Sequence, residues 1–175
     1  MIQKVLLWFY CLPLSAVLFL LLLGGGTFLI LKAAFGHKKF WKGFSCIVLI
    51  LWLLLALSAT VFRSGGSAAE PVLIPFYSYW AALRDGQREL LRSNFMNTAL
   101  FFPAGLFAVE LFPNSWPFRR KVLLTCLSVF LLSMGIEYFQ YRFGLGLAEA
   151  DDVIHNVLGA LLGTILSLAG TTSQK

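Results

Sequence analysis

The sequence predicts an all-α, polytopic integral membrane protein, from its composition and from a series of long apolar segments. Of its 175 residues, 59% are hydrophobic and only 13% are charged, and the mean hydropathy is +0.81. Soluble domains carry about 25% charged residues. A soluble core formed by a chain of this length could not bury so much apolar surface, so we expect the lipid bilayer to cover much of it.

About five segments are apolar and long enough to cross a bilayer, which takes about 20 helical residues. Pro103 lies inside the third segment and is expected to kink it. No polar linker separates the segments, so residues 1–175 are predicted to form a single membrane domain. The predicted spans cover about residues 5–31, 44–62, 94–112, 122–140 and 152–169.

The segment at about 71–92 is more polar and is predicted to lie at the membrane interface or to re-enter it. Within it, V-L-I-P-F-Y (72–77) is apolar enough to dip into the interface. Residues 80–92 alternate apolar and charged side chains in the pattern of an amphipathic interfacial helix. We therefore expect one such helix between the second and third spans.

The net charge of +6 reflects basic connections between the spans. The connections 32–43 and 113–121 hold seven of the fourteen Lys and Arg residues and no acidic residue, so both are expected in the cytoplasm. Connections 63–93 and 141–151 then lie outside, and the orientation of the first segment, which follows Lys4, stays open. Short basic loops of this kind do not indicate a nucleic-acid partner.

No complete catalytic or metal-binding motif is present. Cys11, Cys46 and Cys126 fall inside apolar segments without the spacing of metal ligands. The glycines 24–26 lack the strand and the Lys-Ser/Thr ending of a phosphate loop. The sequence therefore predicts no cofactor and no metal, and whether the protein is an enzyme stays open, with a non-enzymatic role favoured.

Uncommon polar residues gather at the facing ends of the last three spans. Glu137 and Gln140 share a helical face, and Asp152 and Asn156 lie on one stripe of the fifth span. Such groups are costly inside a membrane and usually serve a function. We predict that they line an outward-facing polar pocket, whose candidate residues are Arg92, Asn94, Asn97, Glu137, Gln140, Arg142, Asp151, Asp152 and Asn156.

Each candidate also has a structural alternative. Asp151 could cap the fifth helix, Asn156 could form an interhelical hydrogen bond, and Glu137 could pair with Arg92 or Arg142 rather than act as an acid or base. Gly159 and Gly163 are predicted to form a close helix-packing face. His155 is expected to pack at the interface, and Glu110 is expected to pair with Arg119 or Arg120.

Four motifs occur in an order that resembles the VanZ-like family. The similarity covers residues 73–163, and it implies a multi-pass protein of the bacterial plasma membrane that is associated with resistance to glycopeptides such as teicoplanin. Val72 stands where the family has an amide residue, and Glu149 stands where an Arg is more usual, which leaves Arg142 as the positive charge of that loop. The motifs are L-I-P-F (73–76), N-F-M-N-T-A-L-F-F-P-A-G (94–105), E-Y-F-Q (137–140) and D-D-V-I-H-N-V-L-G-A-L-L-G (151–163).

Three functions remain open at this point. In the first, the pocket binds or screens an envelope component, such as a cell-wall precursor or the glycopeptide itself. In the second, the protein is an intramembrane enzyme acting on a lipid-linked phosphate or sugar precursor, with Arg92 or Arg142 on the phosphate and Glu137 or Asp152 handling protons. In the third, it is a structural subunit whose Gly159–Gly163 face docks another membrane protein, or it forms a homo-oligomer.

Overall fold

A computed structural model describes residues 12–36, 39–61 and 70–172, and this part of the chain is all-α, as predicted. Its only extended pairing among the described residues is one isolated parallel bridge between Val72 and Glu149. The elements are α2 (Leu14–Phe35), α3 (Phe40–Val61), α4 (Tyr77–Arg84), α5 (Arg88–Ala108), the short 3₁₀ helix η1 (Val109–Leu111), α6 (Phe118–Phe143) and α7 (Ala150–Thr172).

Four of the described helices are long and apolar enough to cross a membrane, namely α2, α3, α6 and α7. The protein is therefore a membrane protein, but the predicted count of five spans is not confirmed. The helix that contains the third predicted span, α5, is not among the four because its N-terminal half carries Arg88, Arg92, Asn94 and Asn97. It is nevertheless central, and its buried residues include Met96 and Phe101.

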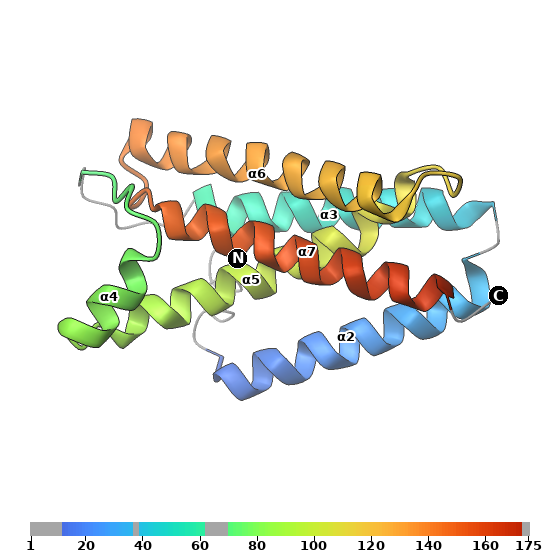
Figure 1. Cartoon of the computed structure of the whole chain (residues 1–175), viewed down its shortest axis with the longest axis horizontal. Helices are drawn as coiled ribbons and strands as arrows, with labels where there is room; N and C mark the ends of the chain where they lie inside the picture. Colours follow the sequence, from blue (N-terminus) through green and yellow to red (C-terminus); the bar gives the residue numbers. More distant parts are fainter. Residues whose placement is uncertain (1–11, 37–38, 62–69, 173–175) are drawn as a thin grey trace.

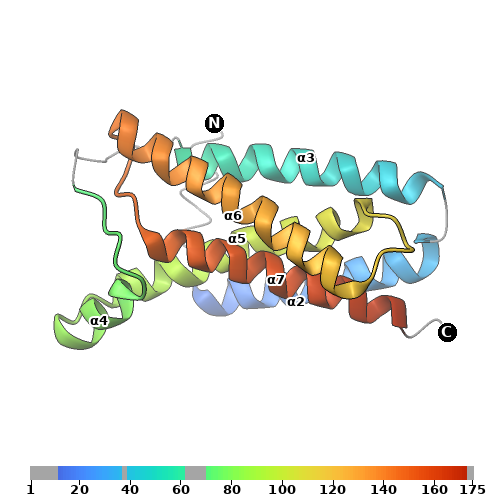
Figure 2. The same cartoon turned by 45° about the horizontal axis from the view of Figure 1, so that its top comes forward.

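The centre of the fold is the contact between α5 and α7, which run parallel and side by side in both views (Figures 1 and 2). Glycines allow the two backbones to approach closely. A Cβ atom on Gly159 would overlap the Thr98 carbonyl oxygen, and one on Gly163 would overlap the Phe102 carbonyl oxygen. Close approach through small residues is a common way for helices to associate in membranes.

The remaining long helices surround this pair. Helix α6 packs along α7, α3 packs against α5 and α6, and α2 contacts α5 and α7 from the other side of the bundle (Figure 1). The exposed faces are rich in large apolar side chains such as Leu22, Ile30 and Leu54. In a membrane protein these faces contact lipid.

The two ends of the bundle differ in composition. The C-terminal end of α2, the start of α3, the segment between η1 and α6, and the C-terminal end of α7 lie at one end (Figure 1). We call this the basic end, defined by residues 36, 39–42 and 112–121. The opposite end holds α4 and the α6–α7 connection, and we call it the α4 end, defined by residues 70–87 and 144–151. This is the grouping of connections that the charge pattern predicted.

Several predicted boundaries need correction. The first of the described helices begins at Leu14, after Pro13, and continues to Phe35, so Lys32 lies inside a helix rather than in a loop. Residues 5–11 of the predicted span lie outside the described residues.

The prediction of a single interfacial helix over 80–92 is wrong. This segment is divided between α4 and the first turns of α5. Gly86 has a positive φ of 69°, and this left-handed conformation, which glycine adopts without strain, ends α4.

Candidate functional site: a polar cluster at the α4 end

The nine candidate residues all lie in the halves of α5, α6 and α7 nearest the α4 end, and seven of them are buried. Their side chains come from three different helices, which the fold brings together only because α5, α6 and α7 pack side by side. We call these seven residues the outer cluster. They are between 2% and 8% exposed and comprise Asn94, Asn97, Glu137, Gln140, Asp151, Asp152 and Asn156.

Asp151 binds the start of α4 rather than capping its own helix. Its carboxylate accepts hydrogen bonds from the backbone N–H of Phe76, from the N–H of Ser78 at 2.8 Å, and from the Ser78 hydroxyl. Asn94 adds a hydrogen bond from its Nδ2 to the Ser78 Oγ at 2.6 Å. Since the first amides of a helix lack intrahelical partners, Asp151 supplies the cap of α4 from a distant helix.

This contact also holds an unusual backbone conformation. Phe76 precedes α4 with φ 62° and ψ 19°, the left-handed region that bulky residues rarely adopt. A non-glycine residue in this region persists when its surroundings fix it. The hydrogen bond from the Phe76 N–H to Asp151 provides such a constraint, so the L-I-P-F motif and the Asp-Asp motif form one structural unit.

His155 is a buried, hydrogen-bonded residue, which the sequence did not indicate. The side chain is 4% exposed. Its Nδ1 lies 2.6 Å from the Asp151 carbonyl oxygen, and its Nε2 lies 2.8 Å from the Tyr79 hydroxyl. A carbonyl can only accept, so Nδ1 carries a proton and donates to Asp151; in a neutral ring Nε2 then accepts from the Tyr79 hydroxyl. The four-residue spacing between Asp151 and His155, which places both on one helical face, is the sequence signal for this contact.

Glu137 contacts the start of α7. Its Oε2 accepts a hydrogen bond from the Glu149 backbone N–H at 3.0 Å, so a carboxylate of α6 lies at the N-terminus of the next helix. The partial positive charge of a helix N-terminus stabilises a negative group at this position. Gln140, one turn further along α6, lies beside Gly146 of the same connection.

Asn156 lies deeper and joins α7 to α6, through a hydrogen bond of 2.7 Å from its Nδ2 to the Ser133 Oγ. Ser133 was missed in the sequence, although it lies four residues before Glu137 on the same face. Three amide atoms of the outer cluster have no hydrogen-bond partner among the described residues. They are two acceptors, Asn94 Oδ1 and Asn156 Oδ1, and one donor, Asn97 Nδ2.

The two candidate arginines lie at the edge of the outer cluster. Arg92 is half-buried and donates to the Leu12 carbonyl oxygen at 2.6 Å, on the side of α2. Arg142 is exposed, with its guanidinium carbon 5.9 Å from the centre of the Phe143 ring. The buried part of the site is therefore made of carboxylates and amides.

Gly159 and Gly163, predicted to pack against a neighbouring helix, lie against α5 of the same chain. The surface that the third hypothesis assigned to a partner protein is thus occupied within the molecule. Among the described residues, no group of three or more His, Cys, Asp and Glu side chains is arranged to hold a metal ion.

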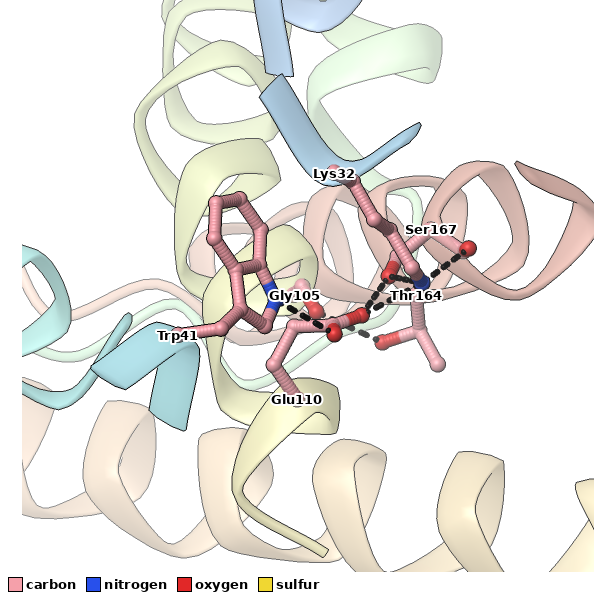
Figure 3. Close-up of polar contacts among 6 residues, drawn as sticks. All are labelled: Lys32, Trp41, Gly105, Glu110, Thr164 and Ser167. Atoms are coloured by element: carbon pink, nitrogen blue, oxygen red, sulfur yellow. Dashed lines mark hydrogen bonds and ion pairs between the residues drawn. The ribbon is translucent and has the colours of Figure 1, made fainter. Parts of the chain in front are cut away.

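A second buried polar cluster lies near the basic end (Figure 3). The Lys32 ammonium donates to Glu110 Oε1 at 2.6 Å, to the Ser167 carbonyl oxygen at 2.6 Å and to Ser167 Oγ at 3.0 Å. Trp41 Nε1 donates to the other Glu110 oxygen at 2.8 Å, and the Ser167 hydroxyl donates to Oε1. The expected pairing of Glu110 with Arg119 or Arg120 is wrong, because Glu110 points into the bundle toward α2.

Of three comparisons with known proteins, one gives a match. No curated protein and no solved structure matches the chain. The family model described as VanZ/LLP1 matches residues 40–170, which extend from the start of α3 into the last turn of α7. The match includes every residue of the outer cluster and most of the chain, and this protein therefore belongs to the VanZ/LLP1 family.

Proposed function

We propose that this protein acts in the bacterial plasma membrane and lowers susceptibility to glycopeptides such as teicoplanin, by binding an envelope component at the outer cluster. Membership of the VanZ/LLP1 family supports the general role. The positive-inside rule places the basic end in the cytoplasm, so the outer cluster faces the cell envelope. A ligand at that end could come from the outer leaflet or from the cell wall.

The observation that carries this proposal is the set of open amide atoms in the outer cluster. Buried polar groups in folded proteins are almost always hydrogen-bonded, and one left unpaired costs about 1–3 kcal/mol. Asn94, Asn97 and Asn156 are each 2% exposed, and each leaves one side-chain atom without a partner among the described residues. Three such atoms at one end of the bundle are explained if a ligand completes their hydrogen bonds.

The chemistry of these groups favours a neutral or amine-bearing ligand. Two open acceptors and one open donor match hydroxyl, amide or ammonium groups, and the nearby carboxylates Glu137, Asp151 and Asp152 would repel a phosphate. The sugar and peptide parts of a cell-wall precursor have this chemistry. The enzymatic alternative requires an arginine on a lipid phosphate, and the exposed position of Arg142 gives it less support.

The proposal is tested by teicoplanin susceptibility in bacteria that express the chain. We expect the wild-type chain to raise the minimal inhibitory concentration, and Asn156→Leu and Glu137→Gln to abolish that increase. The first change removes an open acceptor, and the second removes a charge from the outer cluster. Asn114→Leu is the matched control, because Asn114 is exposed at the basic end.

The amount of each variant in the membrane fraction must be equal for the comparison to hold. Wild-type resistance in both Asn156→Leu and Glu137→Gln, at equal expression, would exclude the outer cluster as the site. No change in susceptibility with the wild-type chain itself would exclude the role in resistance.

A further inference from the structure

Helix α4 has an apolar face that is exposed on the surface of the described structure. Trp80 is 62% exposed and Leu83 is 82% exposed, and their spacing of three residues places both on one side of the helix. Phe76, the N-cap residue four positions before Trp80, is also more than half exposed. So are Leu73 and Ile74 in the preceding loop. We call these five residues the α4 apolar face.

The opposite side of α4 is the one that packs on the bundle. Ser78 and Ala81 are both buried, and each lies two residues before an exposed residue of the α4 apolar face. Two residues correspond to about 200° around a helix, so the apolar face points away from the bundle. Helix α4 lies at the edge of the bundle, beside the start of α5, in both views (Figures 1 and 2). Exposed apolar surface of this kind marks a site of interaction.

The backbone that carries this face is fixed by the α6–α7 connection and by the start of α7. Val72 forms two backbone hydrogen bonds of 2.9 Å, donating to Ala148 and accepting from Ala150. The Asp151 carboxylate accepts the backbone N–H of Phe76, which holds that residue in its left-handed conformation. A backbone held at both points keeps the apolar side chains pointing outward, so the partner that covers them comes from outside the described chain.

The tyrosines indicate which partner this is. Four of the five tyrosines of the chain lie among the described residues, and all four are exposed at or next to the α4 end. They are Tyr77 and Tyr79 on α4 and Tyr138 and Tyr141 in the last two turns of α6. Tyrosine and tryptophan are enriched at membrane–water interfaces, where the ring lies among lipid and the polar group reaches water. Exposed tyrosines on two elements, one of them a candidate span, therefore indicate that lipid borders this end of the bundle.

Charged residues are separated from the α4 apolar face. Residues 71–83 include no charged side chain. Exposed charges follow immediately, from the last residue of α4 to the start of α5, and they are Arg84, Asp85, Arg88 and Glu89. An apolar face with charges gathered at one edge is typical of a segment that lies on a membrane with its polar part in water.

We infer that the α4 apolar face binds the lipid surface at the α4 end, with Phe76, Trp80 and Leu83 against acyl chains and the turn at Gly86 in water. This contact differs from the interfacial helix that the sequence predicted over 80–92, because it uses residues 73–83 and leaves out the start of α5.

The lipid contact is linked to the outer cluster through Asp151. This residue belongs to the cluster and binds the start of α4, so an α4 that is held by lipid also fixes that side of the cluster. The inference does not depend on which ligand the outer cluster binds, since it concerns a face that points away from it.

Spin-label accessibility in the full chain tests this inference. The chain would be reconstituted in nanodiscs of phosphatidylethanolamine and phosphatidylglycerol, in a background in which Cys11, Cys46 and Cys126 are replaced by alanine. A nitroxide label would be attached at Leu83→Cys. Molecular oxygen concentrates in lipid, whereas a nickel chelate stays in water, so the two relaxation agents report which phase surrounds the label.

We expect oxygen to relax the label at Leu83 more strongly than the nickel chelate does. The same result is expected at Leu54→Cys, which lies on the exposed apolar face of α3. Gln87→Cys is the matched control, because Gln87 is exposed in the turn four residues after Leu83, and it should show the reverse order.

A label at Trp80→Cys gives a second reading of the same face and keeps the test valid if Leu83→Cys does not fold. The inference is overturned if the nickel chelate relaxes the labels at Leu83 and Trp80 as strongly as the label at Gln87, because the face then lies in water. It is also overturned if both agents are excluded from Leu83 and Trp80, because a protein surface, such as a second copy of the chain, then covers the face.

Discussion

Lys32 and Glu110 form a largely buried ion pair with a nearly complete set of hydrogen bonds. All three Lys32 donors have acceptors, and both Glu110 oxygens accept from other side chains. The pair connects α2 to η1 and α7, so it fixes the one long helix that packs on the far side of the bundle. Desolvation limits the net stability that such a pair adds, but loss of one partner leaves an uncompensated buried charge.

Removing either partner alone should therefore be strongly destabilising. We expect Lys32→Met and Glu110→Leu each to lower the free energy of unfolding by about 3–5 kcal/mol, as measured by titration with SDS. The double variant should lose much less than the sum of the two, because the charges are coupled. Lys39→Met, at an exposed position of the same end, is the control and should have little effect. Additive losses would show that the pair is not energetically coupled.

At the scale of the helices, the α5–α7 contact determines the position of the outer cluster. Gly159 and Gly163 allow the α7 backbone to lie against α5. Gly105 allows the same close approach from the α5 side, since a Cβ there would overlap the Ala160 carbonyl oxygen. One turn toward the α4 end, the same register brings Asn97 of α5 level with Asn156 of α7. The amide groups therefore depend on glycines that make no polar contact with them.

Bulky side chains at these glycines should separate the two helices. We expect Gly159→Leu and Gly163→Leu each to lower the free energy of unfolding by about 3 kcal/mol or more, because the obstacle is backbone and cannot move aside easily. Gly24→Leu in α2 is the matched control. Nothing lies within 4 Å of a Cβ at Gly24, and leucine favours a helix over glycine. Equal stability of all three variants in detergent would contradict the packing that we describe.

The periodicity of the sequence predicted the long helices but not the break between α4 and α5. Apolar runs of about 20 residues predict spans because lipid leaves few alternatives to a helix. At 80–92 the amphipathic pattern is continuous across Asp85–Gly86, and only the turn propensity of that pair indicates the break. The polar start of α5 also made its span appear to begin at Asn94, although tertiary contacts keep the helix intact from Arg88.

The sequence identified the types of residue at the candidate site better than their partners. The polar residues of the last three spans were recognisable because such groups are rare in membrane helices. Their partners were not, since Ser78 and Asp151 are 73 residues apart and Lys32 and Glu110 are 78 apart. No local pattern encodes contacts of that length. Ser133 alone had a local signal, its four-residue spacing from Glu137 on one helical face, but that spacing does not predict its hydrogen bond with Asn156.

At the scale of the whole molecule, the protein has two polar layers, one near each end of its long apolar helices. Lys32, Glu110 and Lys121 lie at or next to the basic end, and the outer cluster lies next to the α4 end, where α7 contributes Asp151, Asp152 and Asn156. From the positive-inside rule we expect the first layer on the cytoplasmic side and the second on the envelope side. We propose that the outer cluster binds a ligand from the envelope without transforming it.

This proposal is tested by the binding of a lipid-linked cell-wall precursor to the purified protein in lipid nanodiscs. We predict saturable binding without turnover, and a loss of about tenfold in affinity for both Glu137→Gln and Asp152→Asn, which corresponds to about 1.4 kcal/mol. The double variant should be little worse than either single one, as expected for coupled neighbours. Conversion of the precursor by the wild type, or equal binding by all four proteins, would contradict it.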